Sequence, residues 1–155
     1  MNSLTENEVL NILDCVMRNI TNRVVNIQLC KQAMRFSGDT CTVHTKLTGG
    51  YDATLILYAD TNLMTRLTQQ CVQEEKVDPR DVEDFVREYF NVICGQVVSK
   101  LFQTTRVPSR FHIPCFCAGK YIPEQDEVCQ YELNYTTCYN EGVQLIYQVP
   151  KQLKK

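Results

Sequence analysis

Apolar residues recur on one side of the first predicted helix, which follows the capping residues Ser3 and Thr5 and runs to about Asn22. Glu6 and Glu8 supply the acidic first turn that accompanies such caps. One helical stripe, typical of a helix with a single buried side, is formed by Val9, Ile12, Leu13, Val16, Met17 and Ile20.

Alternating apolar and polar residues predict strands in the next part of the chain. Residues 24–34 alternate in this way, and two more strand-like runs follow at 41–47 and 53–59. A turn over 48–51, which contains two glycines, separates the second run from the third. In the first run, the residues on the expected buried side are Val25, Ile27 and Leu29.

Two more helices are predicted between Asp60 and Phe102. Asp60 is a favourable N-cap for a helix whose apolar residues are Leu63, Met64, Leu67, Cys71 and Val72. After a polar loop over 73–76, Asp78 as N-cap and Pro79 at the first helical position open a third helix. This helix runs to about Phe102.

Three strand-like segments close the chain, at 111–118, 128–135 and 143–149, and the turn residues 140–142 join the last two. Hairpin connections favour antiparallel pairing. We therefore expect an α/β chain of the α+β type, with a largely antiparallel sheet and two long helices, the first and third, packed side by side on one face. No linker divides residues 1–155, so one domain is expected.

The composition of the chain mainly excludes certain partners and locations. The formal net charge of −2 favours neither a nucleic acid nor an anionic membrane as partner. The polar, acidic start does not resemble a secretion signal, and no run approaches the ~18 apolar residues of a membrane span. We expect a cytoplasmic protein.

The nine cysteines are odd in number and show no repeating framework. Without an export signal, they are expected to be reduced thiols that pack as small hydrophobes, with no disulfide. The spacing of His112, Cys115 and Cys117 is not a common zinc pattern, so we expect no metal bound by this chain.

One stripe of the third helix is polar and carries candidate chemistry. Glu88, Asn91 and Gly95 fall within about 40° of Asp84 at ~100° per residue, away from the apolar side. A solvated surface is the ordinary explanation of such a stripe. Gly95 is harder to explain, because glycine inside a helix costs about 0.5–1 kcal/mol relative to alanine. Close approach of another molecule's backbone, or a tight helix crossing, would account for it.

An amide and a carboxylate on one face can act together on a partner. The Asn91 amide donates and accepts hydrogen bonds at once, so it can orient a water molecule. Positioning of this kind contributes strongly to phosphoryl transfer. The Glu88 carboxylate can pair with a lysine of a partner. Such a face could complete the active site of another protein.

The segment Asp84-Phe-Val-Arg-Glu88-Tyr-Phe-Asn91-Val-Ile-Cys-Gly95 resembles the [Asp/Ser]-x-x-x-Glu-x-x-Asn signature of the CheC, CheX and FliY phosphatases. The resemblance extends over about 24–149. It includes the glycine-containing hairpin at 47–60, the segment 111–120 with its proline and later glycine, and the closing pair of strands.

The number of motifs favours the CheX type, which carries one, over the CheC type, which carries two. Glu8 and Asn11 also spell Glu-x-x-Asn in the first helix, but Leu4 and Cys15 stand where the upstream acid and the glycine belong. We interpret this second pair as chance, with Glu8 serving the helix cap.

The resemblance implies a phosphatase acting on a phosphorylated CheY-like response regulator. Asn91 would position the attacking water, and Glu88 would pair with the active-site lysine of the regulator. Asp84 and Gly95 would assist docking. The Mg²⁺ would belong to the regulator, so the chain would need no cofactor of its own, and a homodimer is expected. The alternatives are a non-catalytic module of the same fold that binds a regulator or a chemotaxis or flagellar component, and a structural domain whose polar face is only solvated.

Overall fold

A single antiparallel sheet underlies the part of the chain that the computed structural model describes, residues 4–31, 36, 38–50, 52–120 and 128–150. Its strand order is β1-β6-β7-β3-β2-β4, and β5 pairs with β2 beside β4. The strands are β1 (Cys30–Lys31), β2 (Thr40–Gly49), β3 (Ala53–Asp60), β4 (Ser109–Phe111), β5 (Cys115–Ala118), β6 (Val128–Thr136) and β7 (Gly142–Pro150).

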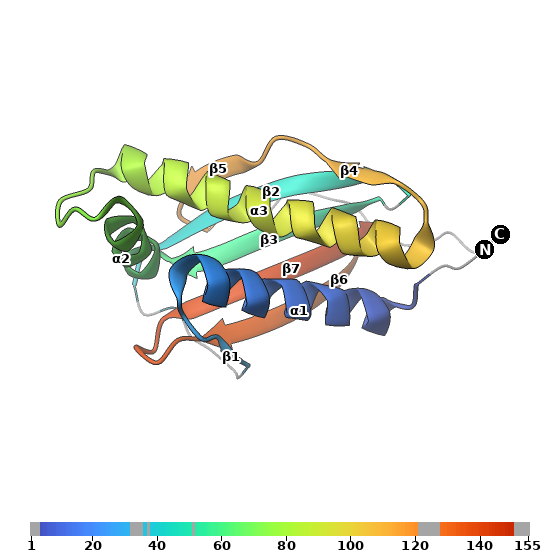
Figure 1. The fold of residues 1–155 in the computed structure, drawn as a ribbon, viewed down its shortest axis with the longest axis horizontal. Helices are drawn as coiled ribbons and strands as arrows, with labels where there is room; N and C mark the ends of the chain where they lie inside the picture. Colours follow the sequence, from blue (N-terminus) through green and yellow to red (C-terminus); the bar gives the residue numbers. More distant parts are fainter. Residues whose placement is uncertain (1–3, 32–35, 37, 51, 121–127, 151–155) are drawn as a thin grey trace.

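Three helices cover one face of this sheet: α1 (Glu6–Val25), α2 (Thr61–Val72) and α3 (Pro79–Thr105). The two long helices, α1 and α3, lie side by side across the strands, and α2 packs at one end of the layer (Figure 1). The predicted fold class is therefore confirmed. None of the described helices is long and apolar enough to cross a lipid bilayer.

Both long helices begin with a cap that the sequence predicts, Thr5 for α1 and Asp78 for α3, while the other predicted cap, Ser3, lies outside the described residues. The Thr5 side chain accepts a hydrogen bond from the backbone of Glu8, and the Glu8 carboxylate accepts one in return from the backbone of Thr5. Asp78 and Asp81 make the same reciprocal pair at the start of α3, where Pro79 occupies the first helical position. These boxes satisfy backbone N–H groups that would otherwise lack partners.

Asp60 precedes α2 as expected, but its side chain does not cap the helix. The buried carboxylate accepts hydrogen bonds from the backbone N–H of Gly142 (2.7 Å) and of Gly38 (3.3 Å). Asp60 therefore ties the start of β7 to the end of β3, a contact between distant segments that a local capping pattern cannot reveal.

The strand predicted over 24–34 is mostly wrong. The first helix continues to Val25 and ends at Asn26, whose φ of 55° is left-handed. Only Cys30–Lys31 pairs with β6, and 32–35 lie outside the described residues. Val25 and Leu29 are buried as the alternation suggests, but from a helix end and a connecting segment. Short apolar alternation does not distinguish these cases.

The strand predicted over 111–118 is interrupted at its middle. Leu47 pairs with Phe111 and His44 pairs with Cys115, so three residues, 112–114, stand opposite two, 45–46. This extra residue is a β-bulge, which breaks the ladder and re-aims side chains. Pro114 lies in it and has no N–H to offer a ladder. The bulge forms one wall of the groove described next.

Candidate functional site

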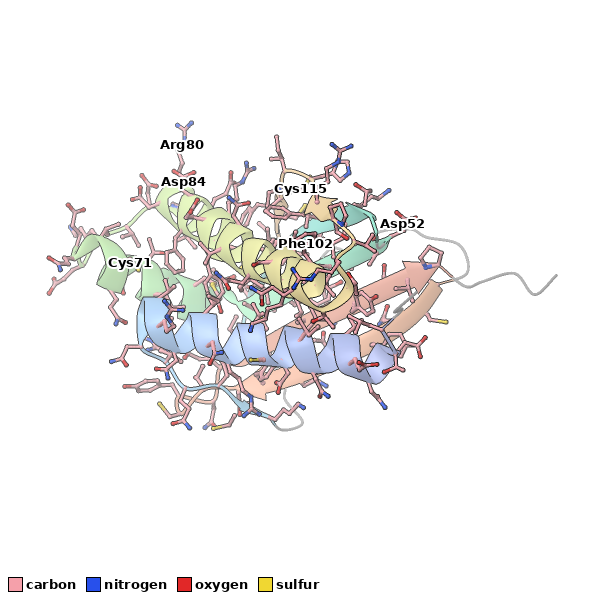
Figure 2. All side chains as sticks on the ribbon, turned by 45° about the vertical axis from the view of Figure 1, so that its right-hand side comes forward. Asp52, Cys71, Arg80, Asp84, Phe102 and Cys115 are labelled. Carbon is pink, nitrogen blue, oxygen red and sulfur yellow. The ribbon has the colours of Figure 1, made fainter. Side chains whose placement is uncertain are left out.

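The buried side of α3 determines which residues face outward. Val86, Phe90 and Ile93 lie in the core with at most 1% of their surface exposed. Asp84, Glu88, Asn91 and Gly95 are all exposed on the opposite side, as the helical spacing predicts. Figure 2 shows Arg80 and Asp84 projecting outward from the N-terminal half of this helix.

A groove of about 330 Å³ runs between this face of α3 and the bulge that separates β4 from β5. Three of the four predicted site residues line it together: Asp84, Glu88 and Asn91. The remaining lining residues are Arg87 of α3 and, on the opposite wall, Phe111, His112, Ile113 and Pro114. Cys115, labelled in Figure 2, begins the strand that follows this wall.

The polar groups of the groove are available to a partner. Among the described residues, no hydrogen bond or salt bridge engages the side chains of Asp84, Glu88 or Asn91. Arg87 is different, because its guanidinium lies 3.2 Å from a carboxylate oxygen of Glu83, one turn earlier. In the described part of the chain, the groove therefore presents two acids without an ion-pair partner and an amide without a hydrogen-bond partner.

Gly95 lies on the same exposed face but does not line the groove. A Cβ placed on it would meet no described atom within 4 Å. A tight helix crossing with any described residue therefore does not explain the glycine. The position is open to solvent, one helical turn beyond Asn91.

The second wall of the groove is the part that sequence reasoning missed. The sequence pattern predicts one continuous strand over these residues, and the spacing of His112 with the cysteines raises only the question of a metal ligand. Pro114 inside the predicted strand was the available signal, since proline in a strand favours an edge or a bulge.

The cysteine and histidine positions do not form a metal centre in the described part of the chain, where no group of three suitable side chains gathers. His112 Nε2 lies 3.5 Å from the Thr48 hydroxyl instead. All nine cysteines are free thiols. Burial raises the pKa of Cys41 to about 11, and it raises the pKa of Cys94 further, so neither thiol is ionised near neutral pH.

Solved structures of chemotaxis proteins share this fold at low sequence identity. CheX of Desulfovibrio desulfuricans is 14% identical with a TM-score of 0.76, over 90% of this chain and 97% of that one. CheX of Vibrio vulnificus is 15% identical with a TM-score of 0.76, over 95% and 99%. A Borrelia burgdorferi CheX–CheY–BeF₃–Mg²⁺ complex is 13% identical with a TM-score of 0.73, over 92% and 98%.

The sheet with its one-sided helical layer is thus the fold of the CheX and CheC class of chemotaxis proteins. The family model described as chemotaxis phosphatase CheX matches residues 41–134, which include α3 and both walls of the groove. The chain belongs to this family. No curated protein sequence matches it significantly.

Proposed function

We propose that the chain is a phosphatase that hydrolyses the aspartyl phosphate of a CheY-like response regulator. The observation that carries this proposal is the free pair formed by Glu88 and Asn91, which faces an open groove on a protein of the CheX family. A partner rather than a small molecule suits this groove, because the polar groups stand on an exposed helix face.

In the proposed reaction, α3 docks on the regulator beside its phosphorylated aspartate. The Asn91 amide accepts a hydrogen bond from the attacking water and donates one to it. This holds the water in line with the bond between phosphorus and the aspartyl oxygen. The new P–O bond forms as the bond to the aspartyl oxygen breaks, which releases inorganic phosphate and restores the carboxylate. The regulator supplies the Mg²⁺, and this chain contributes no metal ligand.

Glu88 is proposed to pair with the active-site lysine of the regulator. Its side chain has no ion-pair partner among the described residues, so the chain itself offers no competitor for that lysine. Asp84, one turn upstream, assists docking rather than chemistry. Gly95 leaves open space on the same face, which allows the partner's backbone to come close.

The complex of the Borrelia protein with CheY, beryllofluoride and Mg²⁺ supports this choice of partner. The main alternative is a binding module of the same fold without catalysis. The presence of both Glu88 and Asn91 favours the enzyme, since binding alone does not require an amide that can orient water.

The test is the lifetime of a phosphorylated CheY-type receiver in the presence and absence of the chain. We expect substoichiometric amounts of the chain to shorten the lifetime with multiple turnovers. An unchanged lifetime combined with measurable binding would favour the non-catalytic module. An unchanged lifetime without binding, across several receivers, would contradict the proposal altogether.

A further inference from the structure

Ile113 is the most exposed large apolar side chain of the described residues, with 85% of its surface accessible. It stands in the groove opposite Glu88 and Asn91. We propose that Ile113 is the apolar docking contact that seats the partner over these two residues and helps to select which receivers are accepted. This inference rests on the proposed function, because the partner is the same phosphorylated receiver.

The exposure of Ile113 is imposed by a well-anchored backbone. The Thr45 hydroxyl donates to the carbonyl oxygen of His112 (2.6 Å), and the His112 N–H donates to the carbonyl oxygen of Lys46 (2.9 Å). On the other side, Pro114 is buried. Ile113 is thus held at the bulge between two anchored residues, where it lines the groove and stays outside the core.

The position of Ile113 distinguishes it from the other exposed apolar residues. Isolated surface hydrophobes are common and need no explanation. Phe102 and Val72 are examples, and neither lines the groove. Ile113 instead lines the same groove as Glu88 and Asn91, so one partner can cover all three side chains in one docking event.

The groove defines the chemistry of the partner surface. The acids Asp84 and Glu88 suit a cation, and the amide suits a phosphoryl group with its attacking water. Ile113 adds a requirement for an apolar side chain on the receiver, beside the phosphorylated aspartate. A receiver with a charged residue there would leave that charge desolvated and unpaired, which lowers affinity and gives selectivity.

The experiment measures binding and turnover separately with a CheY-type receiver. Binding is measured to the receiver carrying Mg²⁺ and beryllofluoride, and turnover is measured on the phosphorylated receiver. Ile113→Ser is compared with Ile113→Val, which keeps an apolar side chain, and with Val72→Ser, a matched change on α2 outside the groove. Serine is used rather than aspartate because it removes the apolar contact without adding a negative charge. A new charge in the acidic groove would change the electrostatic interaction with the receiver as well.

We expect Ile113→Ser to raise the Kd and KM about ten-fold, the effect of losing an apolar contact worth ~1.4 kcal/mol, with kcat at saturation nearly unchanged. Ile113→Val and Val72→Ser should bind like the wild type. Thermal melts of all variants should coincide, because Ile113 is outside the core.

Wild-type affinity in Ile113→Ser would overturn the docking role, even with phosphatase activity intact. An equal loss in Val72→Ser would also overturn it, since the effect would then be unspecific. The proposed function fails in a different way: the wild type would bind the receiver without shortening the lifetime of its phosphate. If the wild type bound no receiver at all, the proposed function and this inference would both be contradicted.

Discussion

The hydroxyl oxygens of Tyr89 on α3 and Thr21 on α1 share a buried hydrogen bond of 2.5 Å. Tyr89 follows Glu88 directly and precedes Asn91 by two residues, so its inward direction fixes the rotation of α3 about its axis. The two proposed catalytic side chains face outward for that reason. Burial raises the pKa of Tyr89 to about 12, and the phenol therefore stays neutral over the working range of the protein.

Tyr89→Phe should destabilise the fold without touching the groove. The Thr21 hydroxyl would be left buried and without its partner, which costs about 1–3 kcal/mol of unfolding free energy. The measurement is the urea midpoint at constant m-value. Combining this change with Thr21→Val removes both polar groups and should recover part of the loss. An unchanged midpoint in Tyr89→Phe would show that the hydrogen bond contributes nothing.

Gly95→Ala should stabilise the chain and weaken its interaction with the receiver. A Cβ at this position meets open space, so the helix gains about 0.5–1 kcal/mol. If the partner's backbone approaches here, the added methyl group raises KM. Gln96→Ala is the control, because it changes the neighbouring exposed position. Greater stability with wild-type KM would remove Gly95 from the docking surface.

The cysteines should differ in reactivity. A thiol reagent at neutral pH should modify the exposed Cys15 and Cys30 quickly, and the buried Cys41 and Cys94 only slowly. Because the pKa of Cys41 is raised, little of this thiol is ionised at neutral pH. The rate at which the reagent modifies Cys41 should therefore increase as the pH approaches 11. Denatured, non-reduced protein should show nine free thiols. A smaller count in protein kept anaerobic would contradict the prediction that no disulfide forms.

The chain is predicted to form a homodimer. The described sheet ends at β1 on one side and at β4 and β5 on the other, and such edges present backbone groups for pairing. Light scattering at micromolar concentration should give twice the chain mass of 17.9 kDa. A mass of one chain would count against the dimer.

Local signals predicted the helices well. The caps at Thr5 and Asp78 and the apolar stripes identified both long helices and the face that bears Asp84, Glu88 and Asn91. The error over 24–34 arose because burial at Val25 and Leu29 is compatible with either a strand or a helix end.

The second wall of the groove could not be predicted in the same way. It depends on the register of β4 and β5 against β2, which places an additional residue between two pairings. Register is a relation between distant segments, so the position of Ile113 opposite Asn91 has no local sequence signal beyond Pro114. The contacts of Asp60 with Gly142 illustrate the same limit.

Glu88→Ala should weaken docking as well as turnover. Losing a desolvated charge pair with the regulator's lysine should cost on the order of 1.5 kcal/mol or more of binding free energy. This corresponds to a rise in Kd of about ten-fold. Asp84→Ala should have a milder effect. Glu74→Ala, an exposed acid beyond the groove, is the matched control. Unchanged binding in Glu88→Ala would exclude the proposed lysine contact.

The most direct test of the mechanism is the dephosphorylation rate of a phosphorylated receiver by Asn91→Ala at saturating concentration. We expect a loss of roughly 10²–10³-fold in kcat, by analogy with other single hydrogen-bond donors, with Kd and melting temperature close to the wild type. Asn62→Ala, an exposed amide on α2, should retain full activity. A wild-type rate in Asn91→Ala would contradict the proposed mechanism, and a rate lost together with the fold would show that this helix face is structural.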